Sequence, residues 1–319
     1  MQELATINNT ELNTRELFTD DEILDYFFAQ LTEHTEKTVQ TYKRNIKPFV
    51  AYLYEIGLNL RTATHQTITG YKQSLRKQGK KPATINGYLS AVRALYKVLS
   101  SNGVCANIAD NIKNEKIHQQ GAKNALSKEQ AQMLLEQPKD GASLKQLRDS
   151  AIITLCMLTG LRTIEVARAN IGDLEQKQGR ETLNIQGKGH NAKDDFVVLE
   201  LEVYRPLMKY LNARKCTDPK APLFASVSNN NAGGRMTTTA ISALIKQAMK
   251  NHGINDAKLT AHSLRHSAVT FALLDGKTPQ QAQKLARHAN INTTLIYAHN
   301  IDKLENEAGK GIIHYLYSA

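Results

Sequence analysis

Apolar residues recur at three- and four-residue steps through the first third of the chain, and this regularity then stops. Between about Leu24 and Leu99 the steps are those of amphipathic helices. One such run contains Val39, Tyr42, Ile46, Phe49, Val50, Leu53 and Tyr54. The runs end at turn-forming sequences, at Gly57, at Gly79 and at residues 101–103. The pattern predicts a compact helical unit at 22–103, preceded by a flexible acidic lead-in at 1–21.

After this unit the amphipathic pattern is lost and the chain becomes rich in Asn, Lys and Gln. We interpret 104–124 as a linker and 125–319 as a second unit. Ser127 and Gln130 form a capping-box pattern at the start of its first helix. Two apolar segments, TLNIQ and FVVLEL, flank a Gly-Lys-Gly turn and predict a hairpin or small meander. Further helices are expected at Leu144–Leu158, Thr237–His252, Ser263–Leu274, Pro279–Arg287 and Asn306–Tyr317. The predicted fold class is mainly α with a small β-sheet.

Size and composition exclude several classes of protein. The chain has 319 residues and 41% hydrophobic content, enough for about two domains with their own cores. No stretch approaches the roughly 20 uncharged apolar residues of a membrane helix, and the acidic N-terminal segment resembles neither a signal peptide nor a transit peptide. Cys105, Cys156 and Cys216 have neither metal-ligand spacing nor the pattern of a disulfide framework. These features predict a reduced cytoplasmic protein without a membrane partner.

Positive charge is concentrated after the N-terminal segment. The formal net charge is +11, but residues 1–36 hold nine acidic residues and one basic residue, Arg15. Residues 37–319 therefore hold 40 basic and 21 acidic residues, a net charge of +19. Neutralising the phosphates of a nucleic acid releases its condensed counterions, so such an excess favours a polyanionic partner.

Four short segments of the second unit carry side chains suited to phosphate and proton chemistry. TGLRTIEVA contains Arg162 and Glu165, QGKGH contains Lys188, HSLRH contains His262 and Arg265, and RHANINTTLIYAH contains His288 and Tyr297. Taken singly, each segment has an ordinary structural explanation, such as a surface ion pair, a solvated turn or a packed tyrosine. Their occurrence together, in this order, indicates a function.

The order Arg, Lys, His-x-x-Arg, His and Tyr in the second half of a basic two-domain chain resembles that of the tyrosine recombinase, or phage integrase, family. The resemblance runs from about Leu24 to Tyr297 and is strongest in TGLRTIEV, HSLRH and TTLIYAH. It implies a helical core-binding, SAM-like DNA-binding domain at 22–103 and a catalytic domain at 125–319. It also implies site-specific recombination, in DNA integration, excision or dimer resolution, through a covalent 3′-phosphotyrosine intermediate.

The same resemblance assigns roles to the candidate residues. The catalytic set is Arg162, Lys188, His262, Arg265, His288 and Tyr297, with Glu165 orienting neighbouring cations. Cleaving a phosphodiester without a metal or cofactor, neither of which we expect here, requires a nucleophile, charge stabilisation, a proton acceptor and a proton donor. Arginine presents a planar fork to phosphate oxygens, which suits Arg162 and Arg265. Tyr297 is the expected nucleophile, His262 the candidate general acid/base, and His288 a further donor to the phosphate. Lys188 is the expected donor to the departing 5′ oxygen.

The match to the family pattern leaves two questions open, one before the nucleophile and one in the hairpin. The family commonly has Leu-Gly-His before the nucleophile, whereas this chain has Ala286-Arg287-His288. A bulky cation in place of the glycine puts the local backbone geometry and the phosphate contacts in question. In the hairpin, Lys193 lies five residues after Lys188, and the Gly-Lys-Gly context favours Lys188.

The resemblance further implies that the two domains clamp double-stranded DNA from opposite faces. Four protomers would assemble on two DNA sites, as a homo-tetramer or with a paralogue, and accessory DNA-bending proteins are candidate partners. The apolar residues Ile312, Ile313, Tyr315 and Leu316 are expected either to dock on a neighbouring protomer or to pack on their own chain as a last helix.

Two other functions use the same residues. A type IB topoisomerase shares this chemistry but relaxes supercoils as a monomer, and the helical first domain favours recombination instead. A catalytically silent DNA-binding regulator would keep the fold, yet every expected catalytic position is filled. Within the recombinases, the short lead-in favours a simple Xer-like enzyme over one with a folded arm-binding domain.

Overall fold

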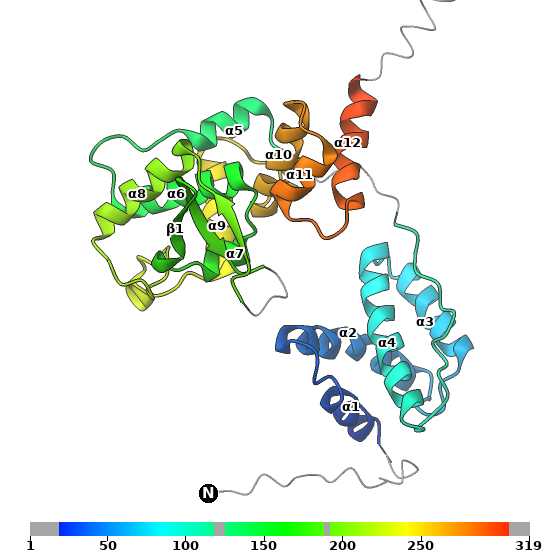
Figure 1. Cartoon of the computed structure of the whole chain (residues 1–319). Coiled ribbons are helices and arrows are strands. Elements are labelled where there is room, and N and C mark those ends of the chain that lie inside the picture. Colours follow the sequence, from blue (N-terminus) through cyan, green and yellow to red (C-terminus); the bar gives the residue numbers. More distant parts are fainter. Residues whose placement is uncertain (1–18, 118–124, 188–191, 306–319) are drawn as a thin grey trace, which may run out of the picture. The chain divides into compact units, whose positions relative to one another are not determined.

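The computed structural model describes residues 19–117, 125–187 and 192–305, except for the side chains of residue 300 and of residues 302–305. Contacts divide the chain into two compact units, Met1–His118 and Gln119–Ala319. Figure 1 shows the elements of each unit, which we describe one unit at a time.

The described part of the N-terminal unit is helical. Its helices are α1 (Asp20–Ala29), α2 (Glu36–Glu55), α3 (His65–Lys77) and α4 (Pro82–Ser101). Threonine side chains cap the first three, with Thr19, Thr35 and Thr64 accepting hydrogen bonds from backbone N–H groups of the first turn. The capping box of Thr19 and Glu22 starts α1 at Asp20, inside the segment that the sequence assigned to the lead-in.

One apolar core holds these helices together. Its residues include Phe27 of α1, Phe49 of α2, Tyr71 of α3 and Leu95 of α4, all fully buried. The first part of the predicted linker belongs to this unit, because Ala109 and Ile112 are buried in the same core. Beyond them, at the end of this segment, the carboxylate of Glu115 pairs with Lys72 and Arg76.

The C-terminal unit combines helices with one small sheet. Its helices are α5 (Lys128–Leu135), α6 (Leu144–Thr159), α7 (Thr163–Arg168), α8 (Leu201–Arg214), α9 (Thr238–Asn251), α10 (Ala261–Leu274), α11 (Pro279–Ala286) and α12 (Asn292–Glu305). Short 3-10 turns lie at Ile171–Asp173 and Asn229–Asn231. The strands β1 (Leu174–Lys177), β2 (Arg180–Ile185) and β3 (Asp195–Val198) form an antiparallel meander in the order β1-β2-β3. The predicted fold class, mainly α with a small sheet, is confirmed.

Helix α6 is the centre of this unit. Most of its residues from Leu147 onwards are buried, and α5, α7, α8, α9 and α10 all contact it. Helices α10, α11 and α12 contact one another and lie side by side in Figure 1. The residues Val269, Ala282, Ala286 and Tyr297 form a small apolar cluster between them. This cluster joins the helix that carries Tyr297 to the helix that carries Arg265.

Several expectations for the second unit were incomplete. The capping box of Ser127 and Gln130 starts α5 as predicted. The segment FVVLEL is a strand only to Val198, and α8 begins at Leu201. Strand β1 and helices α8 and α12 were not predicted. The helix expected at Asn306–Tyr317 lies outside the described residues.

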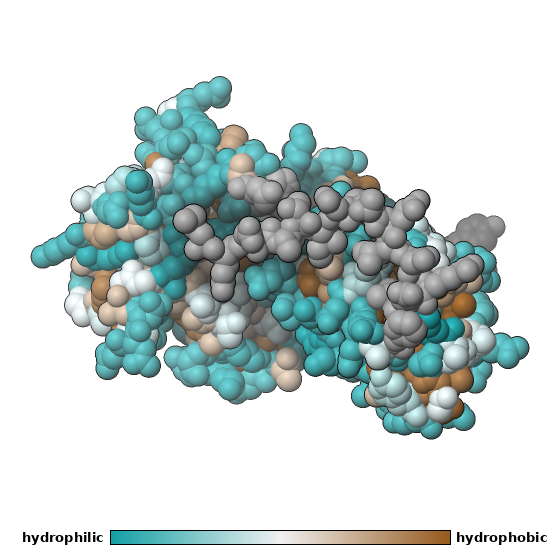
Figure 2. Space-filling view, turned by 90° about the horizontal axis from the view of Figure 1, so that it is seen from below, coloured by the Kyte–Doolittle hydropathy of each residue, from teal (hydrophilic) through white to brown (hydrophobic). Residues whose placement is uncertain are grey.

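On the face in Figure 2, hydrophilic residues predominate over the described part of the chain, and apolar residues lie in small separate groups. None of the helices that the structure describes has the length and apolar character needed to cross a membrane.

Candidate active site

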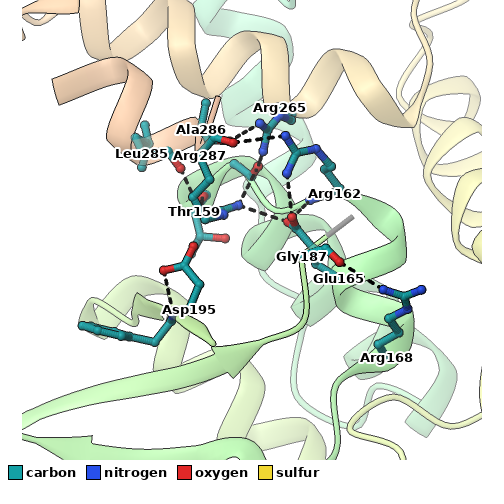
Figure 3. A network of polar contacts seen from close by, with 12 residues as sticks. Thr159, Arg162, Glu165, Arg168, Gly187, Asp195, Arg265, Leu285, Ala286 and Arg287 are labelled. Carbon is teal, nitrogen blue, oxygen red and sulfur yellow. Dashed lines mark hydrogen bonds and ion pairs between the residues drawn. The ribbon is translucent and has the colours of Figure 1, made fainter. Parts of the chain in front are cut away.

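Four separate pieces of chain bring the candidate residues of the C-terminal unit together. Arg162 is the N-cap residue of α7 and Glu165 lies in its first turn. Arg265 lies on α10, and Arg287 follows the last residue of α11. Figure 3 shows these side chains converging through a network of hydrogen bonds and ion pairs. Tyr297 reaches the same region from α12.

A left-handed glycine ends α6 and places a carbonyl group in the centre of this network. Gly160 has a φ of 63°, a conformation that glycine adopts without a steric penalty. Its carbonyl oxygen accepts a hydrogen bond from Arg265 Nη1 at 2.6 Å and another from Arg287 Nη2 at 3.2 Å. Arg265 Nη2 donates to the carbonyl of Ala286. These contacts hold the guanidinium of Arg265 in place, with only 2% of the residue exposed.

Glu165 is the acidic centre of the network. It is 1% exposed, and its carboxylate accepts hydrogen bonds from the Arg162 backbone N–H, Arg162 Nη1 and Arg287 Nη2, at 2.7, 2.7 and 3.1 Å. Burial alone would raise the pKa of Glu165, but the charge of Arg287 and the hydrogen bonds from Arg162 outweigh burial and lower that pKa. Glu165 is therefore ionised and bonds the guanidinium groups of Arg162 and Arg287.

The site holds more buried positive than negative charge. Burial, together with the guanidinium groups of Arg162 and Arg287, lowers the pKa of Arg265 to about 9. Arg265 thus stays charged at neutral pH, but Glu165 alone does not compensate the three guanidinium groups around it. A buried charge without full compensation is costly. This arrangement favours the binding of an anion.

Arg287 has a left-handed backbone conformation, which is more usual for glycine. Its φ is 53° and its ψ is 49°, the left-handed conformation that the common family glycine would adopt at the end of α11. A non-glycine residue pays about 1–2 kcal/mol for this conformation. In return, the guanidinium bonds Glu165 and the carbonyls of Gly160 and Leu285. A glycine at this position would adopt the same conformation without strain, whereas here a third arginine joins the site.

Replacing Arg287 by glycine would relieve the backbone strain at this position but remove the hydrogen bond to Glu165. We expect Arg287→Gly to lower the free energy of unfolding of the C-terminal unit by about 2 kcal/mol, because losing a partner of a buried carboxylate outweighs the relieved backbone strain. Urea unfolding of the two proteins measures the difference. Arg287→Lys, which keeps the charge and the strain, should lose less. A glycine variant more stable than the parent protein would contradict this account.

His288 lies directly after Arg287 and contacts α12. Its Nδ1 shares a hydrogen bond of 2.9 Å with Thr294 Oγ1. Burial, and then the charges of Arg265 and Arg162, lower the pKa of His288 to about 4. The imidazole is therefore neutral at pH 7.

Tyr297 is buried, and its hydroxyl group bonds a histidine that the sequence reasoning did not select. The tyrosine is 5% exposed, and its phenol oxygen is hydrogen-bonded to Nδ1 of His266. Burial raises the pKa of Tyr297 to about 12, although the charge of Arg265 opposes the rise. His262, the selected candidate, is exposed one turn earlier on α10, and its ring packs edge-on against His266 with centroids 4.3 Å apart.

The two lysines of the hairpin differ in what the structure says of them. Lys188 lies outside the described residues, in the loop between β2 and β3. At the base of that loop, Arg168 Nη1 donates to the carbonyl of Gly187 at 3.1 Å. Lys193 forms an ion pair with Asp173, with Nζ–Oδ distances of 2.5 and 2.7 Å. Lys193 is thus paired within the unit, and the preference for Lys188 stays a prediction.

Among the described residues, the fold thus brings together Arg162, Glu165, Arg265, His288 and Tyr297, with His262 at the exposed end of α10. Sequence reasoning did not select Arg287 or His266, both of which contact the candidate residues. Arg287 was visible only as a departure from a glycine. His266 lay inside the selected segment HSLRH, but its partner Tyr297 is 31 residues away in sequence.

Comparison with known proteins gives two family matches. The model of the phage integrase family matches residues 124–303, and that of the phage integrase N-terminal SAM-like domain matches residues 24–103. A tyrosine recombinase of Synechocystis sp. is 30% identical over 232 residues, which cover 72% of this chain and 72% of the relative. The tyrosine recombinase XerD of Rickettsia bellii is 29% identical over 290 residues, 88% of this chain and 93% of the relative.

Solved structures share the fold. The XerH site-specific recombinase, in a post-cleavage complex with a palindromic difH substrate, has a TM-score of 0.72 at 22% identity and covers 92% of this chain and 84% of its own. A lambda integrase dimer bound to a COC′ core site has a TM-score of 0.63 at 16% identity, with 86% and 96% covered.

Proposed function

The chain belongs to the phage integrase family and is a Xer-like tyrosine recombinase, and from this premise we propose that it recombines double-stranded DNA at specific sites with Tyr297 as its nucleophile. The reaction would pass through a covalent 3′-phosphotyrosine and conserve the energy of the phosphodiester, so that rejoining needs no ATP. The helical unit at 22–103 would act as the DNA-binding domain and 125–319 as the catalytic domain.

The buried excess of positive charge is the observation that carries this proposal. Among the described residues, the carboxylate of Glu165 bonds Arg162 and Arg287, and Arg265 lies beside them as a third guanidinium group. The scissile phosphate would supply further negative charge. The side chain of Arg162 is 26% exposed, so a phosphate can reach it from solvent. Donors that are fixed before the reaction stabilise the developing charge of the transition state without reorganisation.

We assign the other candidate residues to the steps of the reaction in turn. Tyr297 attacks the phosphorus, Lys188 protonates the departing 5′ oxygen, and His288 donates a neutral hydrogen bond to the phosphate. His262 lies at the exposed end of α10 and acts as an acid/base group near the DNA. A 5′-hydroxyl group of another strand then attacks the phosphotyrosine and completes the exchange.

We further propose an assembly of four protomers on two DNA sites, as a homo-tetramer or together with a paralogue. The DNA complexes of XerH and of a lambda integrase dimer support DNA as the partner. The apolar residues Ile312, Ile313, Tyr315 and Leu316 would either dock on a neighbouring protomer or pack on their own chain, and accessory DNA-bending proteins are further candidate partners. The DNA substrate would place the protein in the cytoplasm of its cell.

Trapping covalent complexes on genomic DNA tests the proposed function and finds the site. The purified chain is incubated with sheared genomic DNA of its source cell, in EDTA and without ATP. Protein–DNA complexes that survive denaturation are then isolated, and their DNA is sequenced. We expect adducts at one short sequence, joined through a 3′ phosphate.

Two other outcomes would each overturn this proposal. Adducts without sequence preference, together with relaxation of supercoiled plasmid, would identify a type IB topoisomerase. Tight binding at one sequence without any adduct would identify a catalytically silent regulator.

A further inference from the structure

The contact between Tyr297 and His266 joins the proposed nucleophile to an ionisable group that has no role in the mechanism above. His266 is 8% exposed and Tyr297 is 5% exposed. Their ring centroids lie 5.3 Å apart at an interplanar angle of 35°, which brings the phenol oxygen onto Nδ1 of the imidazole. His266 directly follows Arg265 on α10, so the backbone that fixes Arg265 also fixes His266.

The phenol of Tyr297 needs a group that accepts its proton. Because burial raises the pKa of Tyr297 to about 12, the side chain is protonated at neutral pH. A neutral phenol is a weak nucleophile, and its proton must leave as the bond to phosphorus forms. Arg265 favours the phenolate by its charge but carries no lone pair to accept a proton.

A neutral imidazole is a suitable acceptor. With its proton on Nε2, His266 can accept the phenol O–H of Tyr297 at Nδ1. A general base must lie within hydrogen-bonding distance of the proton that it removes, and His266 meets this condition. His262 packs edge-on against the ring of His266 and is exposed, whereas the hydrogen bond that the Tyr297 phenol makes is to His266.

We propose that His266 is the general base of the cleavage step and takes the phenol proton as Tyr297 attacks. The Tyr297 Oη–phosphorus bond forms, the bond from phosphorus to the 5′ oxygen breaks, and the phenol proton moves to His266 Nδ1. The leaving oxygen receives its proton separately, from the group assigned as Lys188. On rejoining, the imidazolium returns the proton to the phenol. This role rests on the proposed function, in which Tyr297 is the nucleophile.

A tyrosine with a more acidic phenol tests this role. Single-turnover cleavage of a nicked suicide substrate, built on the site found above, is measured for the full chain. His266→Phe keeps a ring of similar size in the buried space, and His266→Ala removes the ring. Each variant is prepared with tyrosine or with 3,5-difluorotyrosine at position 297, whose fluorine atoms lower the phenol pKa. DNA binding and thermal unfolding are recorded for every protein.

We expect both His266 variants to cleave roughly 100- to 1,000-fold more slowly than the parent protein, within the usual range for the loss of a general base. Difluorotyrosine should restore most of that rate in the variants and change the parent protein little, because an acidic phenol depends less on a base. His252→Ala is the matched control, since His252 is exposed at the end of α9, and this variant should cleave at the parental rate.

Three results would overturn the inference. Faster or unchanged cleavage by His266→Phe would mean that the contact with His266 only keeps Tyr297 buried and does not assist its attack on phosphorus. An equal deficit with tyrosine and difluorotyrosine would reduce His266 to packing. Loss of DNA binding or of cooperative unfolding in both variants would also make its function structural. An adduct that forms without Tyr297 would instead disprove the nucleophile assignment, and with it the proposed function, whatever the His266 variants do.

Discussion

Tyr297→Phe should abolish the covalent protein–DNA complex and leave DNA binding nearly unchanged. The substitution removes only the hydroxyl group, and the phenyl ring can still pack in the cluster with Val269, Ala282 and Ala286. A nicked substrate that loses its 5′ end on cleavage should trap the parent protein in a band that resists denaturation. The phenylalanine variant should give no such band at any enzyme concentration, while its mobility shift on intact DNA stays the same.

The variant also loses the hydrogen bond to His266, so its stability must be checked. A small decrease in the unfolding temperature, equivalent to about 1 kcal/mol for one buried hydrogen bond, is expected. His299→Phe is a suitable control, because His299 is exposed two residues later on the same helix. If the Tyr297 variant still forms the denaturation-resistant band, another residue is the nucleophile.

Lys188→Ala and Arg265→Ala should both slow cleavage strongly, and a sulfur substitution in the DNA should separate them. Removing a general acid costs roughly 100- to 10,000-fold, and removing a fixed donor to the transition-state charge roughly 100- to 1,000-fold. Sulfur in place of the bridging 5′ oxygen makes a leaving group that needs little protonation. Cleavage by Lys188→Ala should therefore recover on the sulfur substrate. Arg265→Ala should remain slow, because sulfur does not replace the lost charge at the non-bridging oxygens.

Two further variants make this comparison specific. Lys193→Ala should cleave oxygen and sulfur substrates at nearly the parental rates, since Lys193 is paired with Asp173. Arg265→Lys keeps a charge in the buried position and shows how much of the deficit comes from the lost guanidinium fork rather than from the lost charge. Equal recovery of Lys188→Ala and Arg265→Ala, or recovery of neither, would show that the proton donor is assigned wrongly.

Sequence reasoning succeeded where the signal was local. The capping box of Ser127 and Gln130 and the glycine at 160 mark helix ends through interactions within a few residues, and these ends lie where they were predicted. The order of the polar motifs identified the family because each motif is compact. Even the position of the sheet followed from two apolar segments on either side of a turn.

Sequence reasoning failed where packing between distant segments decides the structure. Helix α12 begins with Asn292-Thr293-Thr294, residues of low helix propensity, and it forms against α10 and α11. In the FVVLEL segment, β-branched residues favoured a longer strand than the fold allows, because α8 starts at Leu201. The contact of Tyr297 with His266 exists only because α12 lies against α10, which no local pattern encodes.

The shared carboxylate of Glu165 makes the arginines around it genetically interdependent. Arg162 and Arg287 bind the same buried group, so the effect of replacing one depends on whether the other is present. A glycine introduced at 287 during evolution would leave Arg162 as the remaining arginine on Glu165, and a later loss of Arg162 would then cost far more than it does now. The order in which substitutions arise at these positions therefore restricts which sequences this lineage can reach.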